Sequence, residues 1–193
     1  MTALSHEARP IIVIKIGGGL TAIPGTLDRA CTAVAQAARD RRVLVVPGGG
    51  PFADAVRELD ESLGLSSDAA HWMAILAMDQ YAHVLVERIP GAVLVEEPGA
   101  IFGAMRPGTA AVLAPSRWMR SADVLPHDWD VTSDSIAAFV AGAVDAARLI
   151  LIKPVAAAPD PVDPYFPTAL PSGMPYWVIG SDRLEELPQR LNE

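Results

Sequence analysis

Cysteine, basic charge and long apolar runs are all scarce in this chain of 193 residues. Cys31 is the only cysteine, which excludes an intrachain disulfide and a C-x-x-C metal or redox site. The chain has 15 Lys and Arg and 23 Asp and Glu, which gives a net charge of −8. This balance disfavours nucleic-acid binding, because such binding relies on clustered basic side chains. Apolar runs stay below the roughly 18 residues of a membrane helix, and residues 1–10 lack the apolar stretch of a signal peptide. We therefore expect a cytoplasmic protein with neither nucleic acid nor a membrane as its partner.

Length and hydropathy favour one folded domain. A chain of this size can bury a core without disulfides or structural metal, and its 51% of hydrophobic residues is typical of a folded protein. We expect a single domain over residues 1–193, in which residues 154–175 form a proline-rich loop region.

Short aliphatic runs alternate with helical patterns along the chain. Most of these runs are apolar on both faces, which is typical of parallel strands covered by helices on each side. The predicted strands are 11–16, 43–46, 92–95, 110–113, 149–152 and 176–179. The predicted helices are 26–39, 52–63, 67–88, 132–145 and a short one after Ser181. The alternation predicts the α/β class with a mainly parallel sheet.

Two glycine-rich segments follow the first two predicted strands. Ile14–Gly19 reads Ile-Lys-Ile-Gly-Gly-Gly, and Val45–Pro51 reads Val-Val-Pro-Gly-Gly-Gly-Pro. In each, a strand leads into three glycines and then toward a helix, which offers an anion unhindered backbone N–H groups and a helix N-terminus. Neither segment matches the Walker or the dinucleotide pattern. Because neighbouring parallel strands end at one edge of a sheet, the pair predicts a site for two phosphate-like groups or for a phosphoryl group in transfer between them. The alternative is that both segments are only tight turns.

Two charged residues are candidates for the same site. Lys15 lies in an otherwise aliphatic strand, where an unpaired buried ammonium is costly, so it must reach an anion or, alternatively, extend to solvent at an open sheet edge. Asp134 lies at the start of the helix predicted from residue 132. An acidic residue in a first turn commonly serves the helix dipole. Its functional role would be to pair with Lys15 and orient it.

Other side chains carry weaker signals. Arg57 is a candidate phosphate partner, and Trp129 is either a stacking surface for a flat acceptor ring or a packed loop residue. His71, Asp79 and His83 form a polar stripe on the helix predicted over 67–88, which we interpret as facing solvent, with the wall of an acceptor pocket as the alternative. The rest of that helix is apolar over more than half its circumference and predicts a two-fold dimer interface.

The lysine strand, the two glycine loops and the start of the helix at residue 132 resemble, in this order, the amino acid kinase superfamily. Stretches 47–57, 69–80 and 128–137 are most similar to its aminomethylfuran phosphate kinase branch, which acts in methanofuran-type C1-carrier biosynthesis. The resemblance spans most of residues 11–153. It implies a three-layer αβα sandwich, ATP and Mg²⁺ as cofactors, a small phosphomonoester as acceptor, and a homodimer or higher homo-oligomer.

The resemblance also assigns roles to residues. Lys15 and Asp134 would be catalytic, with Lys15 on the transferring phosphoryl group and Asp134 organising the lysine. The nucleotide phosphates would contact Gly17, Gly18 and Gly19, and the acceptor Gly48, Gly49 and Gly50. No residue is expected to bind a metal directly.

The C-terminal part departs from the family pattern. Many members continue the strand at 149–152 into Thr/Asn-x-Asp-Gly and later carry a second catalytic lysine, both in the ATP-binding half. This chain has Lys153-Pro154 and then the proline-rich stretch, so we expect a reduced nucleotide half. Either Lys153 takes over part of the second lysine's charge at the nucleotide, or nucleotide binding is weakened or lost. A non-catalytic pseudokinase and an oxyanion-binding protein of the same fold are the competing interpretations.

Overall fold

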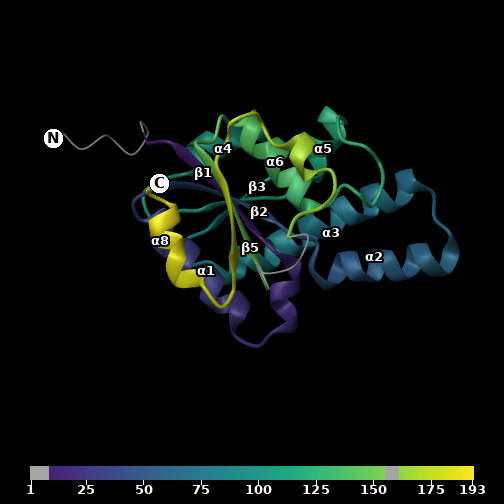
Figure 1. Ribbon diagram of the computed structural model, residues 1–193, viewed down its shortest axis with the longest axis horizontal. Helices are drawn as coiled ribbons and strands as arrows, with labels where there is room; N and C mark the ends of the chain where they lie inside the picture. The colour runs from purple at the N-terminus through teal and green to yellow at the C-terminus, as the bar shows by residue number, and fades with distance from the viewer. Residues whose placement is uncertain (1–8, 155–160) are drawn as a thin grey trace.

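A single sheet of six parallel strands forms the centre of the computed structural model, which describes residues 9–154 and 161–193 (Figure 1). The strands are β1 (Ile11–Ile16), β2 (Arg42–Pro47), β3 (Val93–Val95), β4 (Ala111–Leu113), β5 (Arg148–Lys153) and β6 (Tyr176–Gly180). They lie in the order β3-β4-β2-β1-β5-β6, and every neighbouring pair is parallel. The predicted α/β class and all six predicted strands are confirmed.

The long helices also lie where the hydrophobic pattern predicts them. They are α1 (Thr26–Ala38), α2 (Gly50–Leu63), α3 (Ser67–Arg88) and α6 (Ser133–Ala143). The short helix expected after Ser181 consists of η3 (Leu184–Glu186) and α8 (Leu187–Arg190). Four further short helices were not predicted: η2 (Gly18–Ala22), α4 (Pro98–Ala104), α5 (Ser116–Ala122) and α7 (Phe166–Ala169).

Side-chain alternation along β1 divides the core into two layers. Ile11 and Val13 pack with the apolar side of α6, whereas Ile12, Ile14 and Ile16 pack with α1 on the opposite face. Figure 1 shows α6 on one side of the sheet and α1 and α8 on the other, which confirms the three-layer αβα sandwich. Because side chains of a strand alternate between faces, Lys15 shares the face of Val13 and lies under α6.

The helix α3 lies beside α2 and contributes to both core layers. Ile75 and Met78 belong to the layer that contains α6, and Tyr81 and Leu85 to the layer that contains α1. Much of its apolar surface is therefore covered within the chain, although Leu76 remains 47% exposed. The dimer interface on α3 stays a prediction. In the part of the chain that the structure describes, no helix is long and apolar enough to cross a membrane.

The proline-rich region carries little regular structure where it is described. Residues 155–160 of this region lie outside the described residues. From residue 161 onward, the short helix α7 packs against α6, and Phe166 is buried in the α6 layer. The chain then returns to the sheet as β6.

Candidate active site

The two glycine loops touch each other at the carboxyl ends of β1 and β2. A Cβ atom on Gly18 would lie 2.1 Å from the backbone N of Gly50, and one on Gly48 would lie 2.5 Å from the backbone N of Gly18. Gly50 also has a φ of +58°, in the left-handed region. Only glycine permits this approach of two backbones.

The backbone N–H groups of the loops divide between the sheet and a cavity. The N–H of Gly17 donates to the Ile152 carbonyl and that of Gly48 to the Ile16 carbonyl, each at 2.8 Å, so these two groups extend the sheet. A cavity of about 340 Å³ is lined by the other four glycines, Gly18, Gly19, Gly49 and Gly50. They lie at the starts of η2 and α2, where first-turn N–H groups have no partner within the helix. Of the six glycines predicted to bind phosphate, these four line the cavity, whereas Gly17 and Gly48 donate within the sheet.

Tyr81 of α3 supports both loops. Its ring lies 3.1 Å from where a Cβ on Gly50 would stand, and its hydroxyl donates to the Gly17 carbonyl at 3.5 Å. Burial raises the pKa of the Tyr81 hydroxyl, which therefore stays protonated as a donor. The sequence pattern marked Tyr81 only as part of an apolar face, so this contact was missed.

The chain contains two lysines, and both contact Asp134. The Nζ of Lys15 lies 2.8 Å from Oδ1 of Asp134, and the Nζ of Lys153 lies 2.5 Å from Oδ2. Three elements supply the cluster: Lys15 comes from β1, Lys153 from the end of the neighbouring β5, and Asp134 from the first turn of α6. The structure thus brings together Lys15 and Asp134, as their sequence context predicted, and adds Lys153.

Burial and charge act against each other in this cluster. Burial disfavours the charged form of Asp134, but the ammonium groups of Lys15 and Lys153 outweigh it and hold the carboxyl pKa below its usual value. Burial, followed by the charge of Lys15, lowers the pKa of Lys153, while Asp134 opposes that change. Two ammonium groups share one carboxylate, so the lysines retain positive charge that a phosphoryl group would neutralise.

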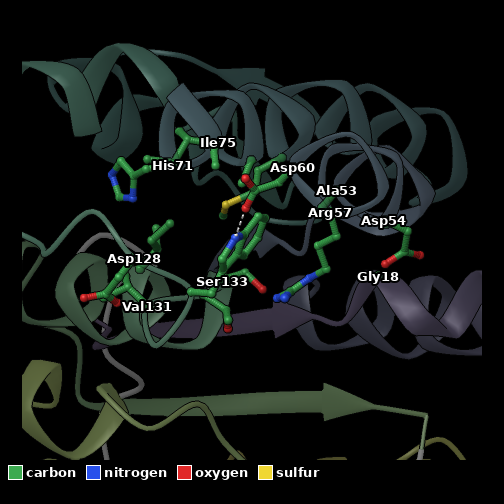
Figure 2. A pocket seen from close by; sticks show the side chains of 18 of the residues that line it. Gly18, Ala53, Asp54, Arg57, Asp60, His71, Ile75, Asp128, Val131 and Ser133 are labelled. Carbon is green, nitrogen blue, oxygen red and sulfur yellow. Dashed lines mark hydrogen bonds between the residues drawn. The ribbon is translucent and has the colours of Figure 1, made fainter. Parts of the chain in front are cut away.

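The cavity beside the glycines has one wall from α2 and α3 and another from the loop before α6. Figure 2 shows Arg57, Asp60 and His71 on the first wall, facing Asp128 and Ser133 on the second.

Trp129 closes part of this cavity and is held by two residues of α2. The guanidinium carbon of Arg57 lies 4.0 Å from the centre of the Trp129 ring, and the indole N–H donates to Asp60 at 2.6 Å. Arg57 also lines the cavity. The two predicted residues therefore line the cavity together, with one ring face of Trp129 covered by Arg57, whereas Asp60 was not predicted.

The interpretation of His71 as solvent-facing is wrong. The residue is only 9% exposed, lines the cavity, and stacks on His127 with ring centres 4.0 Å apart. Burial, and next the charge of His127, lowers the pKa of His71 to about 4, so the imidazole is neutral at pH 7. His127 comes from the loop before α6, which covers this end of α3, and contacts Asp68 and Asp123 at 2.8 and 2.9 Å.

The parallel sheet, the abutting glycine loops and the Lys15–Asp134–Lys153 cluster together define an α/β protein with a candidate anion site at the carboxyl edge of the sheet. The model of the amino acid kinase family matches residues 10–157, and the chain belongs to this family. It is 30% identical over 146 residues to the (5-(aminomethyl)furan-3-yl)methyl phosphate kinase of Methanocaldococcus jannaschii. That alignment covers 74% of this chain and 65% of the relative, so the chain spans about two thirds of its relative's length.

Solved structures share the fold at low sequence identity. The UMP kinase of Bacillus anthracis has a TM-score of 0.67 at 13% identity, covering 95% of this chain and 93% of that one. The uridylate kinase of Archaeoglobus fulgidus has a TM-score of 0.57 at 18% identity, covering 76% and 63%. The aspartate kinase of Synechocystis has a TM-score of 0.60 at 16% identity, covering 89% and 38%. The expected superfamily and the similarity to its aminomethylfuran phosphate kinase branch are confirmed.

Proposed function

We propose that this protein is a kinase that transfers the γ-phosphoryl group of ATP to a phosphomonoester and forms a diphosphate. The observation that carries the proposal is the Lys15–Asp134–Lys153 cluster beside the two abutting glycine loops. Lys15 and the first loop adjoin, since a Cβ on Gly17 would lie 3.8 Å from the lysine Nζ. Phosphoryl transfer depends on positioning and charge neutralisation more than on a nucleophilic side chain, and this cluster supplies both.

In the proposed reaction, an oxygen of the acceptor phosphate attacks the γ-phosphorus of ATP. The bond between that phosphorus and the oxygen bridging to the β-phosphate breaks, and ADP leaves with its electron pair. Lys15 and Lys153 neutralise negative charge on the transferring group, and Asp134 holds the two ammonium groups in place. The N–H groups of Gly18 and Gly19 serve the nucleotide phosphates, and those of Gly49 and Gly50 serve the acceptor phosphate, since Gly17 and Gly48 donate within the sheet.

Lys153 supplies the second positive charge in this proposal. Many members of the superfamily take it from a later segment, whereas here it comes from the end of β5, next to the strand that carries Lys15. Its contact with Oδ2 of Asp134 supports this role, because the same carboxylate then aligns both cations.

We propose that Mg²⁺ enters with ATP as part of the substrate. Asp134 pairs with both lysines, so we assign this carboxylate to holding the two ammonium groups and not to a metal ion. Over residues 9–154 and 161–193, no three His, Cys, Asp or Glu side chains are grouped as metal ligands. The donor set therefore fits an ion held mainly by the nucleotide phosphates, with the lysines as the protein's own contribution to charge neutralisation.

For the acceptor, we propose a phosphate ester of an aminomethylfuran type. The name of the Methanocaldococcus jannaschii relative supports this substrate class. In the cavity, Arg57 offers a charge to the phosphate and Trp129 an aromatic wall to the ring. The carboxylates of Asp54, Asp60 and Asp128, which also line it, would attract the acceptor's ammonium group.

An acceptor panel with MgATP tests the proposal by phosphorus NMR of the products. The panel contains (5-(aminomethyl)furan-3-yl)methyl phosphate, the same ester without the amine, UMP, aspartate and N-acetylglutamate. We expect a diphosphate from the aminomethyl ester at the highest kcat/KM. An acyl phosphate, or UDP as the sole product, would overturn the acceptor class. A raised melting temperature with MgATP but no product from any acceptor would favour the pseudokinase instead.

A further inference from the structure

A carboxylate from a distant segment caps the N-terminus of α6. Oδ2 of Asp163 accepts hydrogen bonds from the Thr132 N–H at 2.9 Å, the Thr132 hydroxyl at 2.7 Å and the Ser135 N–H at 3.0 Å. Its Oδ1 accepts from the Ser135 hydroxyl at 2.5 Å. Thr132 is the N-cap residue, but its own hydroxyl oxygen lies 3.4 Å from the Asp134 N–H, a long contact. Asp163 therefore does most of the capping.

Asp134 lies inside the turn that Asp163 holds. Its neighbours at positions 132 and 135 both donate backbone N–H groups to the Asp163 carboxylate. The Asp134 side chain from the same turn reaches both lysines. A shift of this turn would move the Asp134 carboxylate relative to the lysines, which are fixed in the sheet on β1 and β5.

The segment after the proline-rich stretch is anchored at the same place. The N–H of Tyr165 donates to the Asp130 carbonyl at 3.2 Å, and the buried Phe166 packs against α6. Lys153 and Asp163, which lie on either side of the prolines at 154–161, both contact the first turn of α6 or its cap. The part of the chain that departs from the family pattern is thus tied directly to the lysine cluster.

We propose that Asp163 is a positioning residue, which fixes the first turn of α6 so that one carboxylate, that of Asp134, meets both lysines. All four of its hydrogen bonds are internal, and it is only 7% exposed, so it does not contact a ligand. Its negative charge also acts directly on Lys153, where it opposes the lowering of the pKa by burial, so the Lys15 signal is the readout specific to positioning. Its effect on turnover rests on the proposed function. Its effect on Lys15 rests on the contacts alone.

Lysine-selective isotope labelling tests the role without any activity assay. The chain has two lysines, so ¹³C or ¹⁵N side-chain labelling yields two signals, and both report on contact with Asp134. Asp163→Ala removes the cap, whereas Asp163→Asn keeps its shape, with an oxygen for the three donors and an NH₂ group for the Ser135 hydroxyl. Ser66→Ala is the matched control, because it removes the N-cap of α3, whose side chain accepts from the Ala69 N–H.

We expect Asp163→Ala to move both lysine signals and to lower kcat on the order of 100-fold, as for a misplaced catalytic group, with a much smaller change in KM. Asp163→Asn should keep kcat and the Lys15 signal near their wild-type values, while the Lys153 signal shifts because a nearby negative charge is lost. Ser66→Ala should change neither readout. An unmoved Lys15 signal in Asp163→Ala would overturn the proposal. If that variant does not fold, Asp163→Glu, which keeps the charge but displaces the carboxylate at this buried position, must move both signals. A wild type that transfers no phosphoryl group defeats the proposed function, while the lysine signals still decide the role of Asp163.

Discussion

Replacing Asp134 by Asn leaves one buried and one partly buried ammonium group without their shared carboxylate. The side chains of Lys15 and Lys153 are 7% and 19% exposed, so water can solvate neither fully. Removing one partner of a buried ion pair costs about 3–5 kcal/mol, because the remaining charge stays desolvated. With two cations left, we expect the upper part of that range, a large share of the roughly 5–15 kcal/mol by which a domain is stable.

Urea unfolding followed by circular dichroism measures this loss. Adding Lys15→Met to Asp134→Asn removes the more buried of the two stranded charges, so the double variant should be more stable than Asp134→Asn alone by about 1–4 kcal/mol. As a control, Asp28→Asn breaks the exposed pair with Arg88 and should cost under about 1 kcal/mol. A loss below about 1 kcal/mol in Asp134→Asn, or further destabilisation by Lys15→Met in that background, would refute the buried-cluster reasoning.

Three other perturbations test the loops and the cavity. Gly18→Ala forces a Cβ against the backbone of Gly50 and should abolish the rise in melting temperature with MgATP, whereas Gly99→Ala, which meets open space, should preserve it. Arg57→Gln should raise the acceptor KM about tenfold with little change in kcat, which steady-state kinetics would show, since a charged hydrogen bond is worth about 1.5–3 kcal/mol. Because the pKa of His71 is about 4 in the folded chain against 6.5 unfolded, the unfolded state binds the proton first and stability falls as pH drops through that window. Urea unfolding at pH 7 and pH 4.5 should show a smaller drop in His71→Asn than in the wild type.

Most of the fold could be predicted because the strongest sequence signals are local. The aliphatic runs on either side of Lys15 and at Leu149–Ile152 are apolar on both faces, which is typical of strands covered by helices on each side. The α3 segment carries a long helical pattern after its Ser66 cap. The short helices α4 and α5 could not be predicted, because seven residues carry too little periodicity and α4 contains Pro98 and two glycines.

The sequence predicted the site residues that stand out in their own local context, and it missed those whose partners lie far away along the chain. Lys15 and the glycines stand out, because a charged residue in an aliphatic strand and three consecutive glycines are each unusual enough in sequence to indicate a functional site. Asp60 and Asp163 carry no such signal, since their partners Trp129 and Ser135 lie 69 and 28 residues away. His71 was placed wrongly because helical periodicity does not reveal that the loop before α6 folds over that side of α3.

The central claim is that Lys15 serves a phosphoryl group in transfer. The most direct measurement is phosphorus NMR of the wild type and of Lys15→Met, each with MgATP and (5-(aminomethyl)furan-3-yl)methyl phosphate. We predict ADP and a new diphosphate in the wild type, and neither in a folded Lys15→Met variant at the same concentration. Absence of product in the wild type, or product at an unchanged rate in Lys15→Met, would contradict the claim.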